Sequence, residues 1–344
     1  MSLLAVQNPP NPWASTDVEW IGPPPVAKLQ IYLDQTREIL ARNDSPDLPF
    51  TWSVNPYRGC FHGCAYCYAR PSHEYLSFGA GTDFERRIVV KPEAPRLLAE
   101  AFARPKWKGE LILFSGNTDA YQPLEAAWKL TRGCLEVCLA HHNPVAIITK
   151  APLVERDAEL LARLGEVAHA PVTISIPFAN AEHARALEPT VPPPARRFET
   201  IRRLAAAGVR VGVNVAPIIP GLSDDQIVEV LERARDAGAT YAGMTLVRLP
   251  GPVAEVFGSR VQAAFPDRAE RILHRIQDVR GGKINQAAFG TRMRGEGVYA
   301  DAIHMLFKTT SRRMGYQALP PVPEPSPFRR PAVAAPAVQL GLFD

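Results

Sequence analysis

Three cysteines that lie within eight residues of one another are the side chains best suited to chemistry in this sequence. Cys60, Cys64 and Cys67 occur in the run CFHGCAYC and so have a C-x3-C-x2-C spacing. Thiolates on one short loop can converge on a single inorganic centre. A structural zinc takes four ligands, usually in two separated pairs, whereas a four-iron cluster normally takes four cysteines. Three cysteines would leave one iron of such a cluster open to a substrate or cofactor.

Two other interpretations of this loop stay open: a structural zinc site close to His62, and three cysteines that are simply buried. The chain has five cysteines, an odd number, so a disulfide framework is not expected. Cys134 and Cys138 lie four residues apart on a predicted amphipathic helix. We expect them to be small buried apolar side chains.

The elements that must position the cysteines are strands and helices in alternation. Helical spacing of apolar residues predicts helices over 122–140, 153–164, 195–208 and 223–238, the last capped by Ser223. Short apolar runs predict six strands, which are TWSVNPY (51–57), ELILFSG (110–116), PVAIITK (144–150), PVTISIPF (171–178), VRVGVNVAPII (209–219) and TYAGMTLVRL (240–249).

Apolar strands of this length, separated by helices, predict a parallel sheet covered on both faces. In such folds the chemistry lies at the carboxyl ends of the strands. The cysteines directly follow the first strand, so we expect them at that edge of the sheet.

The cysteine spacing, with an aromatic residue, Tyr66, before the third cysteine, resembles the signature of the radical S-adenosylmethionine (SAM) superfamily. The resemblance covers roughly residues 50–250 and implies a partial (β/α)6 barrel of the TIM type. It implies that Cys60, Cys64 and Cys67 bind a [4Fe-4S] cluster that cleaves SAM reductively to a 5′-deoxyadenosyl radical. It also implies a reductant such as flavodoxin or ferredoxin.

The same resemblance implies a SAM site at the strand ends. Asn117, Thr118 and Asp119 stand where the superfamily holds the amino group of SAM, and Tyr66 adjoins the cluster. The alternative for Asp119 is a helix cap. The remaining implied SAM contacts, each with an ordinary structural alternative, are Lys150 and Ser175 for the carboxylate or ribose and Pro217 and Ile218 for the adenine.

Tyr66 and Tyr68, on either side of Cys67, resemble the branch of spore photoproduct lyase and its many uncharacterised relatives. The lyase reverses a thymine dimer in DNA. That branch has a hydrogen-donating cysteine shortly before a Thr-Ser-Asp stretch. The matching stretch here begins Ser115-Gly116 and has no cysteine. Tyr121, or the cysteine pair on the helix, is therefore an alternative donor. The resemblance implies a lyase-like or other radical-transfer enzyme with Tyr66, Tyr68 and Tyr121 as candidate catalytic residues.

Composition narrows the class of protein. Of the 344 residues, 46% are hydrophobic and 22% are charged, which is ordinary for a globular chain and excludes a wholly disordered one. No apolar run is long enough to span a membrane and no secretory signal is visible, so we expect a cytoplasmic protein. The formal net charge of +4 is too small by itself to indicate a polyanionic partner.

The 34 prolines cluster at the ends and indicate irregular, extended arms. We expect an N-terminal arm at 1–45, the radical SAM core at 46–280, a basic segment packed on the core at 281–318, and a Pro/Ala-rich tether at 319–344.

Two features favour DNA as the substrate. Residues 280–313 contain seven Lys or Arg and two acidic residues, which predicts a phosphate-binding strip or, alternatively, a solvated basic surface. The terminal run QLGLF resembles the peptide by which bacterial replication and repair proteins dock on the sliding clamp. Gln339, Leu340, Leu342 and Phe343 would be its anchors. The alternative is a tail that packs on the barrel.

Two rival functions remain. One is a radical SAM enzyme that modifies a peptide or a small molecule. The other is a metal-bearing adaptor of the sliding clamp without enzymatic activity.

Overall fold

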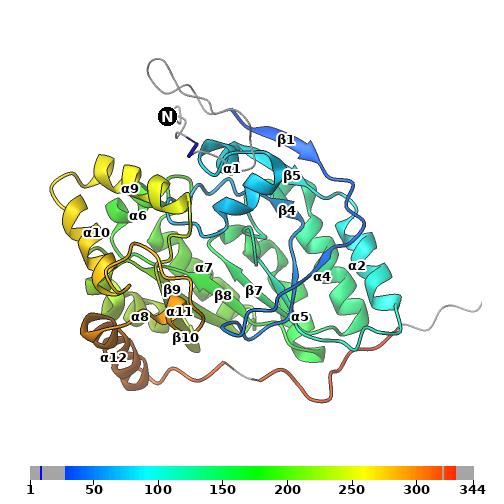
Figure 1. Cartoon of the computed structure of the whole chain (residues 1–344). Helices are drawn as coiled ribbons and strands as arrows, with labels where there is room; N and C mark the ends of the chain where they lie inside the picture. The colour runs from blue at the N-terminus through cyan, green and yellow to red at the C-terminus, as the bar shows by residue number, and fades with distance from the viewer. Residues whose placement is uncertain (1–7, 10–27, 320, 331–344) are drawn as a thin grey trace, which may run out of the picture.

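A computed structural model describes residues 8–9, 28–319 and 321–330 and has a seven-stranded sheet at its centre (Figure 1). The strand order is β10-β9-β8-β7-β6-β3-β2, and every neighbouring pair from β10 to β3 is parallel. The predicted partial (β/α)6 barrel is confirmed, since all six predicted strands are present in this order. The strands of this sheet are β2 (Leu40–Arg42), β3 (Trp52–Val54), β6 (Ile112–Phe114), β7 (Val145–Thr149), β8 (Val172–Ser175), β9 (Val211–Ile218) and β10 (Tyr241–Leu246).

Helices pack against this sheet and shield its apolar side chains from water. The helices are α1 (Thr82–Arg86), α2 (Ala94–Ala103), α3 (Glu125–Trp128), α4 (Leu130–His141), α5 (Ala158–Val167), α6 (Ala181–Leu187), α7 (Pro194–Ala206), α8 (Ile227–Asp236), α9 (Val253–Ala264), α10 (Ala269–Asp278), α11 (Thr291–Arg294) and α12 (Val298–Arg313), with 3-10 turns η1 (Arg70–Leu76), η2 (Pro152–Asp157) and η3 (Asp224–Gln226).

Two of the predicted helices differ in detail from the structure. The helix expected over 122–140 is divided into α3 and α4 at Lys129, whose φ of 53° lies in the left-handed region. Ser223 does not cap the helix that follows it. Its hydroxyl oxygen instead accepts a hydrogen bond from the amide of Ile219, which ties the end of β9 to the turn.

A second, smaller sheet was not expected from the sequence. It contains β1 (Gln30–Leu33), β5 (Arg87–Val90) and β4 (Tyr57–Arg58), in the order β1-β5-β4. Because β4 directly precedes the cysteines, this sheet helps to anchor their loop. β1 and the antiparallel strand β2 both belong to the expected N-terminal arm and join it to the two sheets.

The described part of the tether lies against the core. Residues 314–319 leave α12, and residues 321–330 lie along the lower edge of Figure 1 and reach the ends of α2 and α4. The Phe328 ring lies 5.6 Å from the ring of Phe102 and 6.0 Å from that of His141. Arg330 donates to the carbonyl oxygens of Arg104 and Trp107. This contact lies before the start of β6, at the end of the sheet opposite to the cysteine loop.

The predicted clamp-binding residues, Gln339 to Phe343, lie outside the described residues, as does most of the proline-rich stretch near the N-terminus. Within the described ranges, no helix combines the length and the apolar character that crossing a membrane would require.

Candidate active site

The cysteine loop begins after β4 and lies at the carboxyl edge of the parallel sheet. Gly59 has a φ of 75°, and a Cβ atom there would come within 2.7 Å of the His73 ring, so the tight entry to the loop requires glycine. The amide of Cys60 donates to the carbonyl oxygen of Phe84, and the amide of Cys67 to that of Cys64. Cys60 and Cys64 are buried, and Cys67 is partly exposed.

Arg70 binds the middle of the cysteine loop through backbone carbonyl oxygens. This arginine is fully buried, and its guanidinium donates to the carbonyl oxygens of Cys64 and Gly63 at 2.8–3.2 Å. It also donates to two carbonyl oxygens before α1, at positions 80 and 81, and forms a 2.6 Å ion pair with Glu85. A buried charge is tolerated only when it is paired and hydrogen-bonded in this way.

Residues that follow β6 hold the entry of the loop. The hydroxyl of Thr118 and the side-chain amide of Gln122 both donate to the carbonyl oxygen of Gly59, at 2.7 and 3.2 Å. The oxygen of the same Gln122 amide accepts from the amide of Phe61 at 3.0 Å. Thr118, predicted as a SAM contact, is thus placed beside the cysteine loop and serves to position it.

Asp119 and His62 form a buried pair between β7 and the loop. The carboxylate accepts from the Thr149 hydroxyl at 2.6 Å, the amides of Lys150 and Tyr121 at 2.8 and 2.9 Å, and lies 3.4 Å from His62 Nδ1. Burial works to raise the pKa of Asp119, but His62 and the other donors outweigh it and lower this pKa to about 2. An ammonium group of SAM would have to share a carboxylate that four protein donors already surround.

The same pair acts on the first cysteine. Burial works to raise the pKa of the Cys60 thiol, but the adjacent His62 imidazole outweighs it and lowers this pKa. Burial likewise works to lower the pKa of His62, and Cys60 and Asp119 together raise it to about 10. This environment favours the thiolate, which is the form that binds metal.

A second buried network lies on the other side of the loop. The Tyr66 hydroxyl donates to the carboxylate of Glu188, which also pairs with Arg197, and all three side chains are buried. Lys150 Nζ lies 3.9 Å from the Glu188 carboxylate and 5.8 Å from the centroid of the Tyr66 ring. Arg197 also donates to the carbonyl oxygen of Ser175, at the end of β8. The predicted residues Tyr66, Lys150 and Ser175 are therefore connected through two residues that the sequence did not single out.

Other predicted residues are less directly linked to the loop. The exposed Tyr68 donates to the carbonyl oxygen of Gly116 at 2.9 Å, and the amide of Asn117 donates to Asn55. Tyr121 is fully buried, and its hydroxyl donates to Asp157, so it lies in the core rather than on the open edge. At the end of β9, Pro217 is partly buried and Ile218 is fully buried.

The three cysteines fit an iron-sulfur cluster better than a single metal ion. All of them are free thiols, and burial raises the pKa of Cys64 and that of Cys67. In the described part of the chain, no three His, Cys, Asp or Glu side chains are grouped so that they could hold one ion. A four-iron cluster does not require that convergence, because each cysteine binds a different iron. Cys134 and Cys138, as expected, are fully buried in the core.

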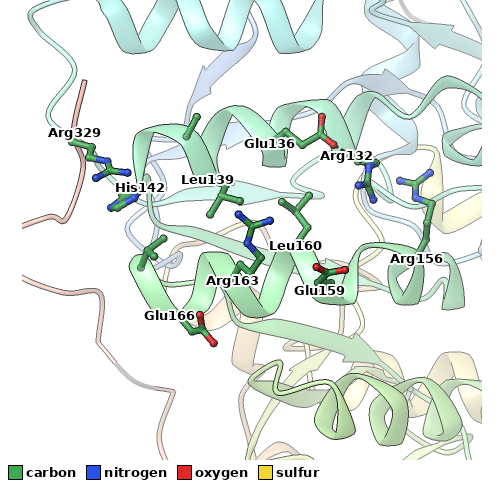
Figure 2. Close-up of a pocket in the computed structure, with 12 residues that line it drawn as sticks. Arg132, Glu136, Leu139, His142, Arg156, Glu159, Leu160, Arg163, Glu166 and Arg329 are labelled. Atoms are coloured by element: carbon green, nitrogen blue, oxygen red, sulfur yellow. Dashed lines mark hydrogen bonds and ion pairs between the residues drawn. The ribbon is translucent and has the colours of Figure 1, made fainter. Parts of the chain in front are cut away.

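A groove of about 630 Å³ lies elsewhere, between α4 and α5 on the outer face of the barrel (Figure 2). Leu139 of α4 and Leu160 and Arg163 of α5 line it, with Arg329 of the C-terminal segment at one end. None of the residues predicted from the sequence as cluster or SAM ligands lines this groove. The groove is therefore separate from the cysteine loop.

The sequence model of the radical SAM superfamily matches residues 54–234, more than half of the chain. The chain therefore belongs to the radical SAM superfamily, whose members are enzymes that use radical chemistry and generally carry a [4Fe-4S] cluster and SAM. An uncharacterized protein of Mycobacterium tuberculosis is 36% identical over 226 residues, which are 65% of this chain and 66% of that protein. An uncharacterized protein of Methanocaldococcus jannaschii is 29% identical over 175 residues, 51% of this chain and 63% of its own length. These matches thus span less than two thirds of either relative.

Solved structures of spore photoproduct lyase have a similar fold. The lyase complexed with dinucleoside spore photoproduct has a TM-score of 0.54 and 17% identity, and the match covers 83% of this chain and 77% of that one. A mutant of the lyase with bound AdoMet and dinucleoside spore photoproduct has a TM-score of 0.51, with the same identity and coverage. At this level of identity the likeness establishes the fold.

Proposed function

We propose that this protein binds one [4Fe-4S] cluster through Cys60, Cys64 and Cys67, cleaves SAM reductively, and acts on DNA. The observation that carries the proposal is the placement of three free thiols on a firmly held loop at the carboxyl edge of a parallel half barrel. When bound, the cluster supplies the electron that cleaves SAM. The chain supplies the geometry, since Arg70, Thr118 and Gln122 fix the loop at its middle and its entry.

In this proposal Lys150 binds the carboxylate of SAM. The Lys150 side chain is 16% exposed, and its carboxylate partner Glu188, at 3.9 Å, is already paired with Arg197. The Lys150 ammonium therefore keeps donor capacity for a second anion. Asp119 acts mainly by holding β7 and His62 in place, because its oxygens already accept four protein contacts.

The fold of spore photoproduct lyase and the two tyrosines beside Cys67 support DNA as the substrate. The lyase reaction itself is not part of the proposal, because Gly116 stands where a hydrogen-donating cysteine is expected. A Cβ atom at Gly116 would lie 3.2 Å from the Ser53 side chain, so this position accepts a side chain only if Ser53 moves.

The reconstituted protein is expected to form 5′-deoxyadenosine from SAM faster when ultraviolet-irradiated DNA is present than when it is absent. The measurement is product formation under anaerobic reduction, with undamaged DNA of the same sequence as the control. An equal rate with damaged DNA, undamaged DNA and no DNA would contradict a DNA substrate. It would favour the rival function, modification of a peptide or small molecule.

The predicted basic strip is distributed over two regions. Arg280 is fully buried and donates to backbone carbonyls, while Arg292 pairs with Asp47 and Arg313 with Glu232. Lys283, which precedes α11, and Arg294, the last residue of α11, are exposed. Lys308 and Arg312 are exposed on α12. A DNA contact through this segment is therefore better sought near α11, at the end of β10.

We further propose that the C-terminal peptide docks on a bacterial sliding clamp. The expected result is that a peptide covering residues 330–344 binds a purified clamp with a Kd near the micromolar range, about −8 kcal/mol. Burying the side chains of Leu340, Leu342 and Phe343 in apolar pockets would each contribute about 1.5–3 kcal/mol before the cost of ordering the peptide. These contributions support an affinity in that range. The matched control carries Leu342→Ala and Phe343→Ala, and equal binding of both peptides would refute the proposal.

A further inference from the structure

Arg248 follows the end of β10 and has strong hydrogen-bond donors without strong acceptors. Its Nε atom is shielded from water and has no hydrogen-bond partner in the described part of the chain. Its Nη1 atom lies 3.4 Å from the sulfur of Met293, and a thioether is a weak acceptor. A shielded N–H donor without an acceptor is costly, and the Nε–H group of Arg248 is such a donor. The arrangement therefore indicates an acceptor that the protein itself does not supply.

Arg280 fixes the position of α11 relative to the end of β10. It is fully buried and donates to the carbonyl oxygens of Leu246 and Val247 at the end of β10, at 3.4 and 2.6 Å. It also donates to the carbonyl oxygens of Thr291 and Arg292 in α11. Because one side chain ties α11 to the end of β10, Met293 is held against Arg248 and the site is built rather than accidental.

The neighbouring carboxylate is already in use. Asp47 pairs with Arg292 at 2.5 Å through one oxygen and accepts from the amide of Gly290 at 2.7 Å through the other. Glu296 is exposed, and its charge works to raise the pKa of Arg280. Burial and the charge of Arg292 lower the pKa of Arg248, while Asp47 acts to raise it.

The position of Arg248 connects it to the cysteine loop. The carboxyl end of β10 lies at the same edge of the sheet as the loop, because all six strands are parallel. An anion bound at Arg248 would therefore lie at the open edge where a substrate must approach the cluster.

We propose that Arg248 binds a phosphodiester group of the nucleic-acid substrate. This assignment rests on the proposed action on DNA and names the residue that holds the backbone there. The planar guanidinium can donate two parallel hydrogen bonds to a phosphate, which a lysine cannot match. Arg280 is buried and donates to backbone carbonyl oxygens, and Arg292 pairs with Asp47. Arg248 is therefore the arginine of these three that can donate to a bound phosphate.

The test is the affinity of the cluster-loaded protein for a short fluorescein-labelled duplex DNA, measured by anisotropy at several salt concentrations. Arg248→Gln is expected to raise the Kd about tenfold or more and to reduce the slope of log Kd against log salt by about one. Arg248→Lys should keep most of the slope with an intermediate Kd. Arg163→Gln, on the outer helix α5 (Figure 2), should match the wild type.

The outcomes separate this inference from the proposed function. If wild type and Arg248→Gln bind the duplex with equal Kd and equal slope, Arg248 is not a phosphate ligand, and the DNA proposal stands. If the wild type does not bind the duplex, both fail. Unchanged cluster absorbance in Arg248→Gln shows that the variant is folded. The Kd and salt slope of Arg248→Lys test separately whether a positive charge at this position binds the DNA.

Discussion

Replacing Cys64 with alanine is expected to abolish reductive cleavage of SAM. Cys64 lies at the centre of the loop, and two of the hydrogen bonds from Arg70 hold its carbonyl oxygen in place. Losing a residue that merely orients a metal ligand typically costs about 10–100-fold in metal affinity or activity. Losing one of three ligands should cost more, so the rate of 5′-deoxyadenosine formation should fall by more than about 100-fold.

Cys138→Ala is the matched control for this prediction. Cys138 is also a buried free cysteine, but it belongs to α4 and packs in the core. After identical anaerobic reconstitution, this variant should retain the iron, the inorganic sulfide and the visible absorbance of the wild type. SAM cleavage by Cys64→Ala at the wild-type rate, or zinc in place of iron and sulfide in the wild type, would contradict the assignment.

The main sheet could be predicted because most of its strands are apolar runs that alternate with helices along the chain. The apolar strands at 145–149 and 211–218, for example, are each followed by a helix. Strands separated by helices in this way pair in parallel. The small sheet could not be predicted in this way. All four residues of β1 are exposed, and β4 has only two residues, so neither gives a clear hydrophobic pattern.

The cysteines could be assigned from the sequence because their chemistry depends on local spacing. The residues that hold them could not, because their partners are distant in the sequence. Glu188 accepts from Tyr66, which lies 122 positions earlier, and no motif surrounds it. Its burial is the signal that identifies it, and this burial appears only in three dimensions. The sequence indicates Asp119 but not its four protein contacts, because two of them come from distant residues, Thr149 at the end of β7 and Lys150 just after it.

Arg70→Met is expected to lower the free energy of unfolding of the apoprotein by about 3–5 kcal/mol, because it leaves a buried carboxylate without its partner. Glu85 has a side chain that is 4% exposed, and Arg260, at 3.9 Å, is its other cation among the described residues. The variant also removes the donors to the carbonyl oxygens of Gly63 and Cys64. Cluster reconstitution should therefore suffer together with stability.

Chemical denaturation of the anaerobic apoprotein provides the measurement, and Arg96→Met provides the control. Arg96 also pairs with two glutamates, but it is 55% exposed, and surface pairs of this kind contribute only about 0–1 kcal/mol. Adding Glu85→Gln to Arg70→Met should restore part of the lost stability, because the second change removes the uncompensated charge. If the two arginine variants lose the same stability, or if the double variant is no more stable than Arg70→Met, the buried pair does not hold the cysteine loop. If both expectations are met, the buried Arg70–Glu85 ion pair stabilises the part of the fold that holds the cysteine loop.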